Sequence, residues 1–154
     1  MVNRRQARIL AMQALCQFDA LGEDFMPQLD DFLGDEQPPQ AVRAYARQLF
    51  RNAQAHRASI DEHIQAAARH WELSRMTTVD RNILRTAVCG LLHGPGVPAK
   101  VVISEAVEIA KEFGAVESPG FVNGVLDAIK ETSRSQNVET SKNRNAEKSN
   151  HGTL

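Results

Sequence analysis

The chain has 154 residues, 42% of them hydrophobic and 24% charged, as is typical of one globular domain. No apolar run reaches the roughly 18 residues that a membrane span needs, and the N-terminus lacks an apolar export signal. We therefore expect a cytoplasmic protein that does not enter a membrane. The net charge of −1 excludes a protein coated in basic charge.

The first expected helix, from Arg4 to about Ala20, has a basic patch at its start. Apolar residues recur along it at helical spacing, and no acidic residue precedes Asp19. Cations are unfavourable at the positive end of a helix dipole, so this patch favours an anionic ligand. A polyanion would avoid the next segment, because residues 19–36 contain seven acidic residues and no Lys or Arg. The patch consists of Arg4, Arg5 and Arg8.

Three more helices are expected before residue 72. A short acidic helix over 23–33 follows Gly22, a long one covers 40–57, and a fourth carries apolar positions from Ile60 to Trp71. The third helix has an arginine stripe that we interpret as a solvated face: Arg43, Arg47 and Arg51. Histidines also recur seven residues apart, at His56, His63 and His70. Helical zinc ligands usually lie one turn apart, so we predict no metal site.

The second half of the chain is predicted to form three helices. The Thr77-x-x-Asp80 pattern predicts a capped fifth helix up to His93, and Pro98 opens a sixth that ends near Phe113. Ser118 is the expected N-cap of a seventh helix that ends near Thr132. Residues 133–154 are polar and predicted to be a disordered tail, because they bury too little apolar surface. The fold class is therefore all-α.

The sequence contains no reactive motif that is specific for an enzyme. The phosphate-cradling, nucleophile-elbow, zinc-protease and dinucleotide patterns are all absent. Cys16 and Cys89 lie in apolar helical patterns and are interpreted as reduced, partly buried hydrophobic residues. We therefore predict a binding protein without a cofactor.

The start of the seventh helix offers a possible ligand site. Unpaired backbone N–H groups at a helix start favour a phosphate, and Gly120 permits a close approach. Phe121 would either stack on an unpaired base or plug the core, and the residues alone favour the core position. The neighbouring Glu117 would accept a hydrogen bond from a base but would also repel phosphates.

Three segments together resemble the bacterial transcription antitermination factor NusB family. The C-terminal half of that family is resembled by Val97–Lys111 of this chain, together with the following Phe113-Gly114 and the FVNGVLD segment of residues 121–127. Its first and fifth helices are similar to two shorter patterns, Arg4-Arg5-x-Ala7-Arg8 with Gln13-Ala14-Leu15 and Asp80-Arg81-x-Ile83-Leu84-Arg85-x-Ala87. The chain departs from the family at Cys16 and Cys89, where tyrosine is frequent, and at Ser104, where asparagine is frequent.

The resemblance implies a fold, a ligand and a partner. The fold is a seven-helix domain of two packed helical subdomains over residues 1–132. The ligand is boxA RNA of ribosomal RNA transcripts, bound together with ribosomal protein S10 so that RNA polymerase resists termination. The implied RNA contacts are Arg4, Arg5, Arg8, Ser118 and Phe121, with Arg85 and Lys100 in addition. The implied S10 contacts are Phe18, Glu72 and Asp80.

Two alternatives stay open at this point. Similar helical domains precede the catalytic domain of ribosomal RNA cytosine methyltransferases, a relationship that requires a following S-adenosylmethionine domain. A protein-interaction module without RNA binding would keep the same fold. Alanine at Arg4, Arg5 and Arg8 would separate that module from an RNA-binding protein, because the module's RNA affinity would not change.

Overall fold

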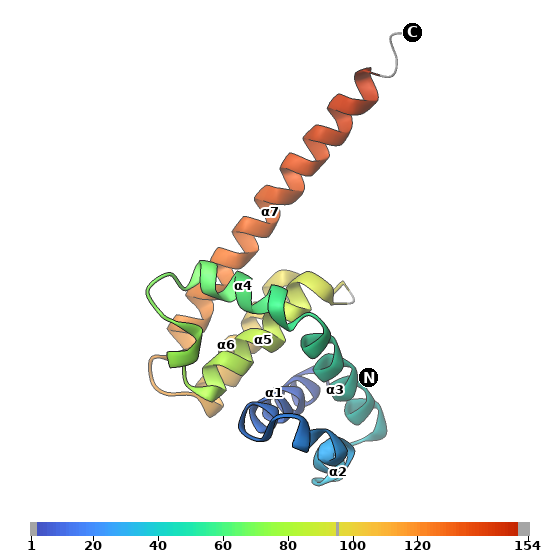
Figure 1. Ribbon diagram of the computed structural model, residues 1–154, viewed down its shortest axis with the longest axis vertical. Helices are drawn as coiled ribbons and strands as arrows, with labels where there is room; N and C mark the ends of the chain where they lie inside the picture. Colours follow the sequence, from blue (N-terminus) through green and yellow to red (C-terminus); the bar gives the residue numbers. More distant parts are fainter. Residues whose placement is uncertain (1–2, 95, 151–154) are drawn as a thin grey trace.

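The computed structural model describes residues 3–94 and 96–150, with backbone alone over 135–150. Within these residues it is built from helices and contains no strand, which confirms the all-α prediction (Figure 1). The α-helices are α1 (Arg4–Leu21), α2 (Leu29–Gly34), α3 (Gln40–Ala55), α4 (Arg57–Ala67), α5 (Thr78–His93), α6 (Ala99–Phe113) and α7 (Ser118–Asn150). Two short 3₁₀ helices join them, η1 (Gly22–Gln28) and η2 (Leu73–Arg75).

The helices form two packed groups, as expected. Helices α1, α2 and α3 lie together on one side, and α4 to α7 form the other group (Figure 1). Helix α5 joins the groups because it contacts α1 and α3 as well as α4, α6 and α7. Its contact face is buried, and burying each such aliphatic side chain contributes about 1.5–3 kcal/mol. Fully buried core residues come from both groups and include Leu15, Phe50, Ile60, Leu84 and Leu126.

Capping residues fix the helix ends near the candidate site. The Asn3 side chain accepts a hydrogen bond from the Gln6 N–H at 3.0 Å, which sets the start of α1. Gly22 ends that helix with φ 64°, a left-handed conformation that suits glycine. The Thr77 hydroxyl accepts from the Asp80 N–H at 3.1 Å, which confirms the predicted cap of α5.

Two of the predicted helices differ from those observed. The acidic second helix is instead the 3₁₀ helix η1 followed by the short α2, and Pro27 at the end of η1 lacks the N–H that an α-helix uses. The fourth helix ends at Ala67, so Trp71 lies in the turn beyond it. The Gln65 side chain there accepts a hydrogen bond from the Leu73 N–H at 2.9 Å, which stabilises the turn.

Helix α7 continues through Asn150, past its predicted end near Thr132. Its last turns project away from the other helices (Figure 1). An isolated polar helix is marginal in water. The disordered tail over 133–154, of which residues 151–154 lie outside the described residues, and the domain boundary before it therefore stay predictions. None of the described helices is both long and apolar enough to cross a membrane.

Candidate nucleic-acid interface

The basic start of α1 separates into exposed and buried arginines. Arg4 and Arg5 are exposed, whereas Arg8 is only 5% exposed and forms an ion pair with Glu105 of α6. This ion pair sets the start of α1, with Arg5 one turn before Arg8, against α6. The pKa of Glu108 is held below its usual value first by the hydrogen bond and charge of Lys111, and also by the charge of Arg5. The two exposed arginines are therefore the ones placed to meet a polyanion.

A groove between α6 and α7 connects this region to the start of α7. Its volume is about 520 Å³, and Glu108, which lies near Arg5, is on its wall. The exposed Lys100 lies on the same wall, while Pro119 and Gly120 line the α7 side. The structure thus places Arg5, Lys100 and the start of α7 along one surface. Further lining residues are Ser104, Asn123, Asp127 and Lys130.

The Ser118 side chain faces inward at this helix start. It is 1% exposed, and its hydroxyl accepts a hydrogen bond from the Ala115 N–H at 2.9 Å. The contact with the preceding turn is tight, since a Cβ atom at Gly114 would lie 2.6 Å from the Ser118 Cβ and Oγ atoms. The prediction that Ser118 is the N-cap is therefore wrong: it is the first helical residue and holds the turn against α7. Its predicted RNA contact has no support from the buried hydroxyl.

The rest of the first α7 turns is open to a ligand. A Cβ atom added at Gly120 or Gly124 would meet nothing within 4 Å. Phe121 is half-buried, and it packs against the core. Its ring also meets the ring of Trp71 edge-on, with centroids 6.2 Å apart and planes at 70°. Phe121 therefore combines the two positions that the sequence left open, a core contact and an aromatic ring near the surface.

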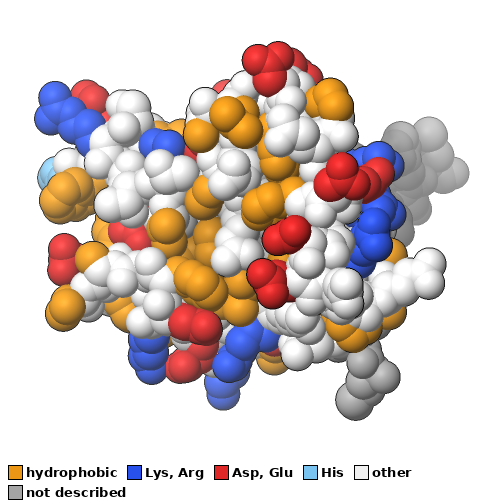
Figure 2. Space-filling view, turned by 90° about the horizontal axis from the view of Figure 1, so that it is seen from below, with side chains coloured by type: hydrophobic (Ala, Val, Ile, Leu, Met, Phe, Trp, Pro, Cys, Tyr) orange, Lys and Arg blue, Asp and Glu red, His pale blue; other side chains and the backbone are white. Residues whose placement is uncertain are grey.

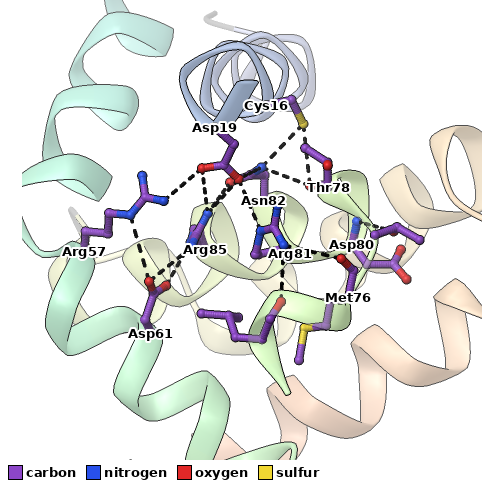
Figure 3. Close-up of polar contacts among 12 residues, drawn as sticks. Cys16, Asp19, Arg57, Asp61, Met76, Thr78, Asp80, Arg81, Asn82 and Arg85 are labelled. Carbon is purple, nitrogen blue, oxygen red and sulfur yellow. Dashed lines mark hydrogen bonds and ion pairs between the residues drawn. The ribbon is translucent and has the colours of Figure 1, made fainter. Parts of the chain in front are cut away.

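Arg85, a predicted RNA contact, lies instead in a charge cluster between α1, α4 and α5 (Figure 3). The side chain is 6% exposed and forms two parallel hydrogen bonds with Asp61, at 2.8 and 3.1 Å. It also donates to Asp19 at 3.0 Å. With both carboxylates in contact, this guanidinium has no free edge for a phosphate. The geometry therefore favours a structural role for Arg85.

Asp19 is the centre of this charge cluster, and sequence reasoning did not find it. Arg57 donates to it at 2.8 Å, Arg81 at 3.2 Å and the Asn82 amide at 3.0 Å (Figure 3). Burial would raise the pKa of Asp19, but the hydrogen bonds from Asn82 and Arg57 and the charge of Arg85 lower it below its usual value. The sequence signs of the cluster are that Arg81 and Arg85 lie one turn apart on α5, and that Arg57 and Asp61 lie one turn apart on α4.

One of the residues predicted to meet S10, Glu72, lines a second depression over the charge cluster. Its volume is about 550 Å³, and the exposed Glu72 is part of its lining together with Arg57 and Arg81. The Phe18 ring is outside this lining but contacts one of its residues, because the Arg57 guanidinium lies 5.7 Å from the ring centre. Asp80 is half-buried in the first turn of α5, directly before Arg81.

Comparison with known proteins assigns the chain to a family. The NusB family model matches residues 5–131. The transcription antitermination protein NusB of Geotalea uraniireducens is 42% identical over 138 residues, which are 84% of this chain and 94% of that protein. That of Anaeromyxobacter dehalogenans is 44% identical over 128 residues, or 82% and 89% of the two chains.

Solved structures agree with the sequence comparison. The solved structure of T. maritima NusB superposes on this chain with a TM-score of 0.76 at 36% identity. The match covers 85% of this chain and 93% of that one. A complex of the antitermination factors NusB and NusE with double-stranded RNA matches with a TM-score of 0.73 at 28% identity, covering 84% and 96%. On the strength of the family model and these relatives, the chain belongs to the NusB family.

Proposed function

We propose that this protein is a transcription antitermination factor that binds boxA-type single-stranded RNA of ribosomal RNA transcripts together with ribosomal protein S10. The observation that carries the proposal is the groove formed by Lys100 and the open start of α7, against which the Arg8–Glu105 ion pair holds the basic start of α1. The relatives support it, because they are named antitermination proteins and one solved NusB is in complex with NusE, which is S10, and RNA.

Burial separates the side chains that we expect to contact RNA from those with a structural role. Arg4, Arg5 and Lys100 are exposed and position phosphates, which fixes the RNA without reading its sequence. Unpaired bases stack and form hydrogen bonds, and these contacts select the sequence. Phe121 is the stacking residue of this set. Arg8, Ser118 and Arg85 act indirectly, because their side chains hold α1, the α6–α7 turn and α5 in place.

The partner is proposed to bind at the depression beside the charge cluster. Glu72 is exposed there, the Phe18 ring contacts Arg57 of its lining, and Asp80 directly precedes Arg81 of its lining. The net charge of −1 and the dispersed basic side chains on the face in Figure 2 favour modest RNA affinity for the protein alone. S10 is therefore expected to raise the affinity of the complex.

The proposal places the protein among binding factors rather than enzymes, and it includes no cofactor. Its relatives carry antitermination names, and transcription in bacteria takes place in the cytoplasm, where we expect this protein to act. A module that binds only protein is the competing function. Replacing both Arg4 and Arg5 by alanine distinguishes the two, since that module would keep its RNA affinity unchanged.

The test is a mobility-shift titration with boxA RNA and a scrambled RNA of the same composition. Each RNA is measured at two salt concentrations, with and without S10. We expect tighter binding to boxA than to the scrambled RNA, and a further gain when S10 is present. Equal, weak binding to both RNAs would contradict the proposal, whatever the dependence on salt.

A further inference from the structure

Trp71 is an exposed aromatic residue that none of the roles above uses. It is the one tryptophan of the chain and is 59% exposed. Its turn is fixed by hydrogen bonds, because its N–H donates to the Ala68 carbonyl at 3.1 Å and its carbonyl accepts from the Gln65 side chain at 2.9 Å. The indole is therefore held at the surface in a defined place.

The contact with Phe121 joins Trp71 to the start of α7. An edge-on contact occupies at most one face of each ring, and the exposure of Trp71 leaves indole surface open. Gly120 lies directly before Phe121 and Gly124 three residues after it on α7, and among the described residues no other element reaches within 4 Å of where their Cβ atoms would be. A flat ligand can therefore cross the helix at the glycines and reach the two rings.

The residues around Trp71 indicate an anionic ligand with aromatic groups. Arg69, His70 and Arg75 are exposed within four residues of it, and Glu72 is paired with Arg75 at 3.5 Å. A protein-docking residue is usually the centre of a larger desolvated patch, whereas the chain neighbours of Trp71 are exposed and charged or polar. Aromatic rings beside cations are the usual features of a single-stranded nucleic-acid site.

We propose that Trp71 and Phe121 together form an aromatic step on which an unpaired RNA base stacks. The inference rests on the proposed RNA-binding function and adds a residue from the turn after α4 to the α7 site. Stacking on an aromatic side chain contributes to affinity with little regard to base identity. Trp71 is thus an affinity-determining residue, and base selection comes from the neighbouring polar contacts.

Trp71 also supplies the measurement, since fluorescence of the unmodified protein reports on this one indole. Titration with boxA RNA is expected to quench it along the same curve as complex formation in a mobility shift. A second RNA series with single abasic sites then locates the stacked base. Removal of that base should abolish most of the quenching, while abasic sites elsewhere leave the quenching at saturation unchanged.

Variants test the contribution to affinity. We expect Trp71→Ala to weaken boxA binding roughly tenfold and Trp71→Phe, which keeps an aromatic face, less than threefold. Met26→Ala removes another exposed apolar side chain, on η1, and should leave both affinity and quenching as in the wild type. With the abasic RNA, Trp71→Ala should have no further effect, because the base it contacts is absent.

The outcomes separate this inference from the proposed function. Wild-type protein that does not distinguish boxA from scrambled RNA would overturn both. Selective binding without quenching, and with Trp71→Ala within twofold of the wild type, would overturn the stacking role alone. Loss of S10 affinity in Trp71→Ala with unchanged RNA affinity would also overturn it and assign Trp71 to the protein partner.

Discussion

Arginines in two regions of this protein have opposite surroundings. In the charge cluster, Arg81 and Arg85 of α5 meet Asp19 of α1, and Arg85 also meets Asp61 of α4. At the start of α1, which Arg8 holds against α6, Arg4 and Arg5 are exposed. Both regions are rich in cations, yet the charge cluster is a structural joint, where ion pairs connect α1, α4 and α5, and the start of α1 is open to a ligand. The difference depends on whether carboxylates from distant helices arrive at the guanidinium groups.

The largest expected effect is the loss of stability in Asp19→Ala, which removes the central carboxylate of the charge cluster. Breaking a buried ion pair by removing one partner costs about 3–5 kcal/mol, and we expect about 3 kcal/mol here because Arg85 keeps Asp61. Chemical denaturation measures the change in free energy of unfolding. Glu36→Ala, at an exposed acidic residue, is the control and should lie within about 0.5 kcal/mol of the wild type. Equal stability of the two variants would mean that the cluster does not hold the helices together.

Substitution of Arg8 tests which arginines at the start of α1 are structural and which bind RNA. We expect Arg8→Ala to lower the free energy of unfolding by about 2 kcal/mol, because Glu105 of α6 loses its charged partner in a largely buried position. Arg5→Ala, three residues earlier and exposed, should leave stability unchanged and weaken RNA binding instead. Thermal unfolding and RNA titration of both variants check this. The reverse pattern would place Arg8 at the RNA interface and give Arg5 the structural role at the start of α1.

The contrast between the two regions also shows which features of this protein could be predicted from its sequence. Helical periodicity predicted the all-α fold, and local chemistry predicted the ends at Gly22 and Thr77, since these features depend on neighbouring residues. The burial of Arg8 was missed, because Glu105 lies 97 residues further along the chain. The same reason hid the pairing of Asp19 with Arg85, and it hid the contact of Trp71 with Phe121.

Acid should weaken the structural joint. The pKa of Asp19 is lower in the folded protein than its usual value of 3.8, so the folded state binds the proton less readily than the unfolded state. The stabilisation is therefore complete above about pH 3.8 and is lost as the pH falls through the lower, folded pKa. The stability difference between wild type and Asp19→Asn should shrink over this range. A difference that is constant with pH would show that the pKa of Asp19 is the same in the folded and unfolded protein.

The smallest effect is expected at the open surface, where each cation acts alone in water. Arg5→Ala and Lys100→Ala should each weaken boxA binding only a few-fold, to a similar extent for boxA and scrambled RNA, because a phosphate contact carries no sequence information. Each lost contact should also reduce the slope of log affinity against log salt concentration by about 0.7 for single-stranded RNA. Arg51→Ala on α3, also an exposed arginine, should leave the slope unchanged. A full slope in Lys100→Ala would exclude Lys100 from the phosphate path and restrict the interface to α1 and the start of α7.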